Sequence, residues 1–322
     1  MTAYTQVSAN RFKTWVIMFA FAIFITLMAY VLTLALGFEG PSALGFSGLA
    51  LIIAGIMNFI SYYNSDKIVM AISGAKQIQK KDHPGLFRTV ENLCIASGLP
   101  VPKIYIINDT ATNAFATGRD PQHAAIAFTT GILQKLNRLE LEGVTAHELS
   151  HVGNFDTRLM TIVSILVGTV ALLADFFLRM SFHSSRDHEN RGSGVFMLIG
   201  LIMALLAPII AILIQLAISR KREFLADASG AVLTRHPDGL ADALLKISAD
   251  REPLEVANKA TAHLYIVNPF KQDATGHKAE GPVEDPERSR RERSRGAVGW
   301  FAGLFNTHPP IAERVKALRA MQ

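Results

Sequence analysis

The stretch Thr145-Ala146-His147-Glu148-Leu149-Ser150-His151 sets the class of this protein, because its residue types and their spacing together specify a chemistry. It contains the pattern H-E-x-x-H. Residues four apart lie on one face of an α-helix, so His147 and His151 can offer two imidazole nitrogens to one Zn²⁺. Glu148 lies beside them, and a carboxylate there can take a proton from a water whose pKa the metal has lowered. The stretch therefore predicts a zinc site with Glu148 as catalytic base.

The residues around the motif predict the helix that such a site needs. The run from Arg138 to Gly153 has helical character, and Asn137 just before it is a suitable N-cap. Glu140 stands three residues after Asn137, which is the capping-box position. We therefore expect a helix from about Arg138 to Gly153.

A zinc hydrolase site needs three protein ligands, and it leaves a fourth position for water. Downstream, the run from Arg220 to Asp227 supplies a helical E-x-x-x-D. Glu223 is the candidate for the third ligand, and Asp227, one turn later, can hold the outer nitrogen of a ligand histidine. Taken alone, two acidic residues one turn apart are typical of a solvated helix face. The joint pattern with the upstream motif favours the metal site.

These stretches resemble the HtpX-type membrane zinc endopeptidases, which are relatives of the CAAX prenyl proteases, and the resemblance covers nearly the whole chain. It is carried by residues 113–118 (Asn-Ala-Phe-Ala-Thr-Gly), 147–156, 223–227 and 307–310 (Thr-His-Pro-Pro). The resemblance implies one Zn²⁺ per chain, held by His147, His151 and Glu223, with Glu148 as the base. It also implies a mainly helical α+β fold with a zincin-type catalytic domain and a small β-sheet.

The composition excludes an ordinary soluble domain. Half of the 322 residues are hydrophobic and the mean hydropathy is +0.26, with the apolar residues gathered in blocks. A single cysteine, Cys94, rules out a disulfide framework within the chain. The net charge is +5, but the basic residues are scattered or flank apolar blocks, so we expect contact with membrane lipids and none with nucleic acid.

Two apolar blocks near the N-terminus predict a transmembrane hairpin within residues 1–66. The first, Thr14 to Leu36, has no charged residue and is long enough to cross a membrane; the second runs from about Ala43 to Tyr62. A signal peptide is the rival interpretation of the first block, which its length disfavours. Basic residues flank the hairpin and none lies in its turn, which predicts that both ends are cytoplasmic.

A second hydrophobic hairpin is predicted within residues 158–219, from blocks at 159–178 and 195–218. Because zinc would join residues on either side of this pair, His151 and Glu223 must lie on one side of the membrane, which an even number of crossings satisfies. The first block of the pair carries Asp175 and several small polar residues, so the alternative is a hairpin that lies in the interface or packs on the catalytic domain. About four transmembrane helices are thus expected in total. The intervening loop histidines, His183 and His188, have no partner at metal-ligand spacing.

The catalytic domain is expected in two parts, residues 67–157 and 220–322. In the first part the pattern predicts a helix from Pro84 to Gly98 and strands at Lys103 to Ile107 and Ala124 to Thr129. We assign Asn113 to Thr117 to an edge strand that pairs with the substrate backbone, with Asn113 as a candidate substrate contact. The alternative for this stretch is a simple hairpin loop.

The second part is predicted to contain a mobile loop at about 271–296 and a short amphipathic C-terminal helix built on Ile311, Val315 and Leu318. A donor aimed at the oxyanion of the tetrahedral intermediate would assist peptide hydrolysis. The resemblance makes His308, or else Arg314, a candidate for this role. A helix-capping or core histidine is the competing interpretation of His308.

The sequence as a whole predicts a multi-pass protein of the cell (inner) membrane with a cytoplasmic zinc endopeptidase domain. The resemblance implies that it removes misfolded or damaged membrane proteins, so its partners would be membrane lipids and unfolded or membrane-protein substrates. Two alternatives stay open: a narrower CAAX prenyl-type protease, and a non-enzymatic membrane scaffold stabilised by zinc. A transporter is disfavoured, because the apolar blocks carry only one charged residue, Asp175.

Overall fold

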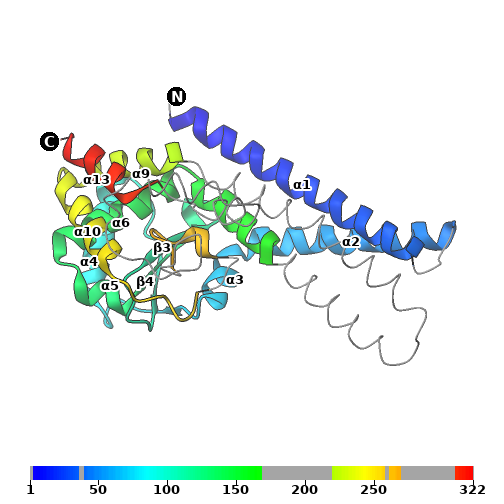
Figure 1. The fold of residues 1–322 in the computed structure, drawn as a ribbon, viewed down its shortest axis with the longest axis horizontal. Coiled ribbons are helices and arrows are strands. Elements are labelled where there is room, and N and C mark those ends of the chain that lie inside the picture. The colour runs from blue at the N-terminus through cyan, green and yellow to red at the C-terminus, as the bar shows by residue number, and fades with distance from the viewer. Residues whose placement is uncertain (1–2, 36–39, 169–219, 258–260, 270–308, 322) are drawn as a thin grey trace, which may run out of the picture.

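The computed structural model describes residues 3–35, 40–168, 220–257, 261–269 and 309–321. Two long helices, α1 (Ala3–Ala35) and α2 (Pro41–Tyr63), lie side by side and form an arm that extends from an α+β body (Figure 1). The helices of the arm are joined by a bond from the Asn58 side-chain amide to the Met18 carbonyl, 3.2 Å long, and by stacking of Trp15 on Tyr62. The predicted N-terminal hairpin is therefore a helical pair.

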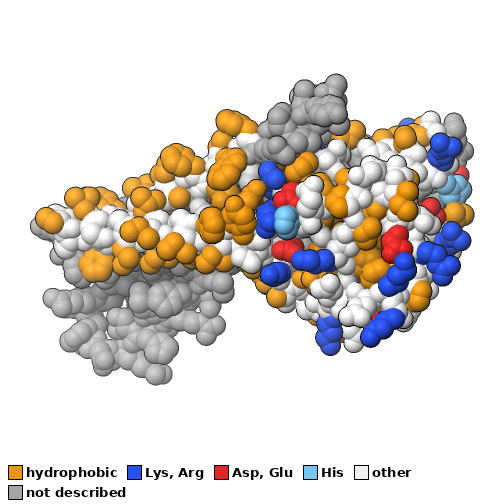
Figure 2. All heavy atoms as spheres, turned by 180° about the vertical axis from the view of Figure 1, so that it is seen from behind, with side chains coloured by type: hydrophobic (Ala, Val, Ile, Leu, Met, Phe, Trp, Pro, Cys, Tyr) orange, Lys and Arg blue, Asp and Glu red, His pale blue; other side chains and the backbone are white. Residues whose placement is uncertain are grey.

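The surface of the arm is apolar. Figure 2 shows hydrophobic side chains along its whole length, whereas Lys and Arg side chains gather on the body. The exposed large apolar residues of the arm include Phe12, Trp15, Phe19, Ile23 and Leu27 on α1, and Leu44, Leu51, Ile52, Ile56 and Phe59 on α2. Among the described residues one helix, Leu44–Tyr63, is long and apolar enough to cross a membrane, and Phe12–Leu27 is a shorter apolar stretch. The number of membrane spans stays a prediction.

The body is built on a small mixed sheet with the strand order β1-β2-β4-β3. Its strands are β1 (Lys76–Gln77), β2 (Lys103–Ile107), β3 (Ala114–Gly118) and β4 (Ala124–Thr129). β2 and β4 are parallel, and the other two pairs are antiparallel. Both predicted strands are confirmed, and the stretch assigned to an edge strand forms β3 at one edge of the sheet rather than a loop.

Alternation along β4 places its side chains in two cores, one on each face of the sheet. Ile126 and Phe128 face a core shared with α4 (Pro84–Ser97), α6 (Arg138–Gly153), α10 (Pro237–Ala249) and α13 (Ile311–Arg319). Ala125 and Ala127 face a second core, which includes residues of α1, of α3 (Ser65–Ile72) and of the helical residues 156–168. The remaining described elements are α5 (Thr130–Lys135), α9 (Arg220–Thr234) and the short 3₁₀ turns η1 (Pro121–His123) and η2 (Ala262–Leu264).

The beginning of the predicted second hairpin packs on the body. Residues 159–167 are buried, and Thr161 accepts a hydrogen bond from the Gly118 backbone N–H at the end of β3. Ser164 contacts His263 at 3.2 Å. The described part of the first block, up to residue 168, thus contacts the body, and the choice between two crossings and a hairpin that packs on the catalytic domain stays a prediction. The rest of both blocks, with His183, His188 and the predicted loop at 271–296, lies outside the described residues.

The packing of α6 on α10 depends on a glycine. A Cβ added at Gly143 would lie 2.6 Å from the Leu240 backbone nitrogen and 2.8 Å from its Cα, so Gly143→Ala must push the two helices apart. We expect it to lower the free energy of unfolding by about 1–3 kcal/mol, measured by denaturant titration in detergent. Gly85→Ala in α4 is the control, because nothing lies within 4 Å of its Cβ position, and it should cause no loss. Equal stability of the two variants would contradict this packing argument.

Candidate metal centre

Helix α6 begins and ends as the sequence predicts. The Asn137 side chain accepts the Glu140 backbone N–H at 3.0 Å, and the Glu140 carboxylate accepts the Asn137 N–H at 2.8 Å. This capping box fixes the start of the helix, and Lys246 of α10 adds an ion pair to Glu140 at 2.8 Å. The helix runs to Gly153, so the H-E-x-x-H motif lies in its buried third and fourth turns.

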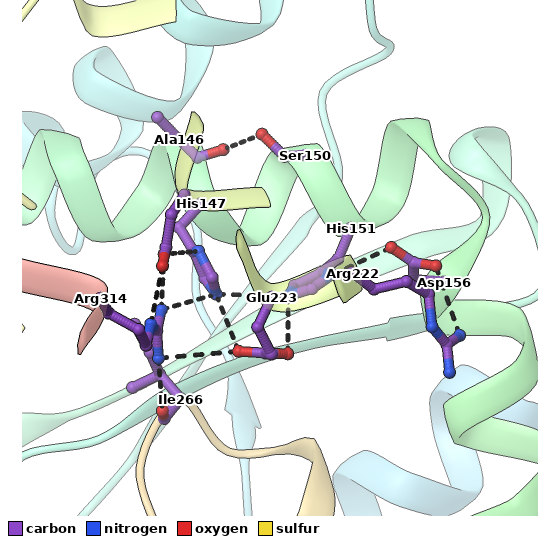
Figure 3. Close-up of polar contacts among 10 residues, drawn as sticks. Ala146, His147, Ser150, His151, Asp156, Arg222, Glu223, Ile266 and Arg314 are labelled. Atoms are coloured by element: carbon purple, nitrogen blue, oxygen red, sulfur yellow. Dashed lines mark hydrogen bonds and ion pairs between the residues drawn. The ribbon is translucent and has the colours of Figure 1, made fainter. Parts of the chain in front are cut away.

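The structure brings His147, His151 and Glu223 together. The two Nε2 atoms are 3.2 Å apart, and the Glu223 carboxylate oxygens lie 3.9 Å from His147 Nε2 and 3.5 Å from His151 Nε2. All three side chains are buried, and one ligand atom from each lies within 4.8 Å of the others (Figure 3). Tetrahedral ligands at ~2.0–2.1 Å from Zn²⁺ would be ~3.3–3.4 Å apart, so the spacing fits such an ion.

The chemistry of the donors also fits a cation. Nδ1 of His147 lies 2.9 Å from a carboxylate oxygen of Asp227, and Nδ1 of His151 lies 3.2 Å from one of Asp156. A carboxylate at Nδ1 holds the proton on that nitrogen and leaves Nε2 with a lone pair. Two lone pairs and a carboxylate therefore converge on one buried point, which is stable when a positive charge lies between them.

Asp227 thus lies where the sequence predicts it, beside a histidine of the H-E-x-x-H motif, His147. Asp156 is a residue that the motif does not predict, since it follows the end of α6. The only sequence signal for it is an acidic side chain five residues after His151, and this spacing does not correspond to one face of a continuous helix. The bond to His151 exists because the chain turns at residues 154–155.

Glu148 is buried next to the ligand cluster, on the side of β3. Burial raises the pKa of its carboxyl to about 7; the charges of His151 and Glu223 act on it in opposite directions. The Ala116 backbone N–H of β3 donates to this carboxylate, which lowers the pKa in part. At His151, burial would lower the pKa, but the hydrogen bond that Nδ1 donates to Asp156 and the charge of Glu223 raise it to about 9. The site therefore favours a positive charge, and the pKa of Glu148 lies close to neutral pH.

Arg314 of α13 is fully buried, and Asp227 is its main partner. Its Nε and Nη2 atoms donate to the two oxygens of that carboxylate at 2.8 and 2.6 Å. Burial would raise the pKa of Asp227, but these bonds to Arg314 keep it below its usual value. The guanidinium also lies 3.6 Å from Glu223 and 3.4 Å from the Ile266 carbonyl (Figure 3).

Two predicted substrate contacts have different outcomes in the structure. The Asn113 side chain is buried at the start of β3, where its amide donates to the Val267 carbonyl at 2.9 Å and its oxygen accepts the Ala114 N–H. It thereby fastens β3 to the segment that follows η2. His308 lies outside the described residues, so its role stays a prediction.

The chain is similar to known proteins over most of its length. The model of peptidase family M48 matches residues 80–322. A protease HtpX homolog of Dictyoglomus thermophilum is 41% identical over 322 residues, covering 99% of this chain and 95% of that protein. One of Tropheryma whipplei is 40% identical over 323 residues, covering 99% and 98%. The crystal structure of Ste24p from S. mikatae aligns with a TM-score of 0.47 and 19% identity, over 92% of this chain and 66% of that one.

The chain is therefore a metalloprotease, and it belongs to peptidase family M48. Its relatives over nearly the whole length are proteases of the HtpX group, which confirms the resemblance seen in the sequence. The family implies a metal, and the buried His-His-Glu group is where the described residues can hold one.

The buried pair of Arg314 and Asp227 gives a stability test. Arg314→Met removes the guanidinium and leaves a buried carboxylate without its main partner, so we expect a loss of about 3–5 kcal/mol in the free energy of unfolding. Adding Asp227→Asn should recover part of that loss, because no buried charge then stays unpaired. The matched control is Arg319→Ala on the same helix, whose pair with Asp242 is half exposed and should contribute less than about 1 kcal/mol. Similar losses for Arg314→Met and Arg319→Ala would contradict the assignment.

Proposed function

We propose that the protein is a membrane-bound zinc endopeptidase in which His147, His151 and Glu223 hold one Zn²⁺ per chain and Glu148 is the catalytic base. The observation that carries this proposal is the convergence of the two Nε2 atoms and one carboxylate at distances that fit one tetrahedral ion. Three ligands leave a fourth position for water and substrate, which is typical of catalytic rather than structural zinc.

Bound Zn²⁺ would polarise the peptide carbonyl and lower the pKa of the attacking water. Glu148 would take a proton from that water and later deliver it to the leaving amine. A group that both accepts and donates a proton works best when its pKa is close to the working pH, and burial brings Glu148 to about 7. The bond from the Ala116 N–H holds the carboxylate in place and connects it to β3.

Substrate binding is proposed along β3. This strand lies at the edge of the sheet and runs beside Glu148, so a peptide added to it would pass next to the ligand cluster. Within the described residues this edge already has internal partners: the Ala116 N–H donates to Glu148 and the Gly118 N–H to the Thr161 hydroxyl. At Ala114, the carbonyl accepts the Ile266 N–H at 3.0 Å. A peptide pairing at Ala114 would replace that bond, and Asn113 would exchange its contact with Val267 for one to the substrate. His308 is proposed as an additional donor to the oxyanion.

The proposed biological role is the removal of misfolded or damaged membrane proteins, with the catalytic domain on the cytoplasmic side of the inner membrane. Main-chain pairing along an edge strand demands little of the substrate's side chains, and this suits a protease that acts on many unfolded sequences. The apolar arm would provide the contact with membrane lipids.

Glu148→Gln tests the chemistry. The amide has nearly the same shape but cannot accept a proton, so we expect the turnover number to fall at least ~10²-fold while the metal content stays at one zinc per chain. The measurement is cleavage of casein by the purified protein in detergent, together with metal analysis of both proteins. Cleavage by Glu148→Gln at the wild-type rate would refute the mechanism.

Glu223→Ala tests the coordination. Removal of a residue that only hydrogen-bonds to a metal ligand typically lowers metal affinity ~10–100-fold, so we expect Glu223→Ala, which removes a direct ligand, to lower it further. Zinc affinity is measured by competition with a coloured chelator. Glu91→Ala, which removes a partly exposed partner of Lys80, is the control and should bind zinc like the wild type. Chelation of the wild type should abolish activity but leave most of its thermal stability. Loss of the fold on chelation would instead support the zinc-stabilised scaffold.

A further inference from the structure

The two ligand histidines are supported in the same way. Behind His147 lies a carboxylate, Asp227, which in turn binds a buried arginine, Arg314. Behind His151 lies Asp156, whose carboxylate contacts a second arginine, Arg222. The E-x-x-x-D pattern predicts the carboxylate of the first arrangement. The second arrangement comes from residues that belong to neither motif.

The contacts of Asp156 point in two directions. One carboxylate oxygen lies 3.2 Å from Nδ1 of His151, and the other lies 3.4 Å from Nη1 of Arg222 (Figure 3). Asp156 is 1% exposed and Arg222 is 8% exposed. A carboxylate at this depth is stable when it is paired and hydrogen-bonded, and these two contacts provide such partners.

The chain adopts an unusual backbone conformation to place Asp156 there. α6 ends at Gly153, Asn154 caps it, and Phe155 takes a left-handed conformation with φ of 58°. This conformation is uncommon for a large side chain and persists only where the surroundings enforce it. Here the Phe155 ring packs 5.0 Å from the guanidinium of Arg158. The turn interrupts the helix at residues 154–155, and Asp156, the first residue after it, contacts His151 at 3.2 Å.

Arg222 connects this turn to the second part of the site. It directly precedes Glu223 in α9 and is 66 residues away from Asp156 in the sequence. The pair therefore joins the end of the motif helix to the helix that carries the candidate third ligand. One carboxylate orients an imidazole with one oxygen and holds α9 with the other.

We propose that Asp156 is a positioning residue of the metal centre and that Arg222 fixes its carboxylate. Asp156 keeps the proton of His151 on Nδ1 and turns Nε2 toward Glu223, and the Arg222 contact keeps Glu223 at bonding distance. This inference rests on the proposed roles of His151 and Glu223 as ligands. Outer carboxylates of this kind raise the basicity of a ligand imidazole and restrict its rotation.

The test compares Asp156→Asn with a matched control. Asp66→Asn serves for this purpose, since Asp66 is also buried and also pairs with a basic residue, Lys103 at 3.0 Å. Zinc affinity is measured by chelator competition on the full-length protein in detergent. We expect Asp156→Asn to bind zinc ~10–100-fold more weakly and Asp66→Asn to bind it like the wild type. In the cobalt-substituted proteins, the visible absorption bands should shift for Asp156→Asn alone, because the His151–metal bond changes.

Arg222→Gln provides a second variant if Asp156→Asn does not fold. It leaves Asp156 in place but removes the charge that holds it, so it should weaken zinc binding in the same direction and by a smaller factor. Wild-type zinc affinity and an unchanged cobalt spectrum in either folded variant would overturn the inference. If the wild type itself bound no zinc, the proposed function would fail first, and the two failures are therefore distinguishable.

Discussion

The structure depends on keeping electron-pair donors close together in a buried place. His147, His151 and Glu223 converge there with Glu148 beside them, and each would prefer water or a positive charge as its neighbour. Two features oppose their separation: carboxylates hold the outer nitrogens of both histidines, and arginines hold those carboxylates. The helix that carries the motif is fixed at its start by a capping box and along its length by close contact with α10. The fold can therefore present an almost complete coordination sphere.

Local patterns in the sequence predict the local parts of this arrangement. The helix from Arg138 to Gly153, with its cap at Asn137, follows from neighbouring residues alone, as do strands β2 and β4. Two of the candidate ligands, His147 and His151, follow from helical spacing. Glu223 lies 72 residues after His151, so only the joint motif and the family resemblance predict that it belongs to the site. Asp156 is not predicted, because its place depends on a left-handed turn at Phe155. Arg314 is predicted only as an alternative oxyanion donor, and its bond to Asp227 depends on tertiary packing.

Sequence patterns also leave parts of the sheet and of the predicted second hairpin undetermined. Both faces of β4 are buried, so its composition does not distinguish parallel from antiparallel pairing, and β1 is too short to leave a pattern. In residues 156–168, Thr157, Thr161 and Ser164 recur at helical spacing within an apolar block. Mean hydropathy averages over the block and does not reveal these three polar residues on one helix face. Two of them make contacts in the structure, Thr161 to β3 and Ser164 to His263. A helix with such a stripe is suited to packing on protein rather than on lipid alone.

The same contacts fix the apolar arm relative to the site. Arg119 directly follows β3, donates to the Tyr63 carbonyl at the end of α2 at 2.7 Å, and lies 5.0 Å from the centre of the Tyr63 ring. Arg158, which lies two residues after Asp156, donates to the Arg119 carbonyl and packs against the Tyr62 ring. Trp15 and Tyr62 stack at this end of the arm, and such residues are enriched at membrane interfaces. Because α2, β3 and the turn after α6 meet at these arginines, a substrate strand paired with β3 would lie beside the base of the arm. These contacts connect the edge of the sheet directly to the apolar arm, which contains the one helix of the described residues that is long and apolar enough to cross a membrane.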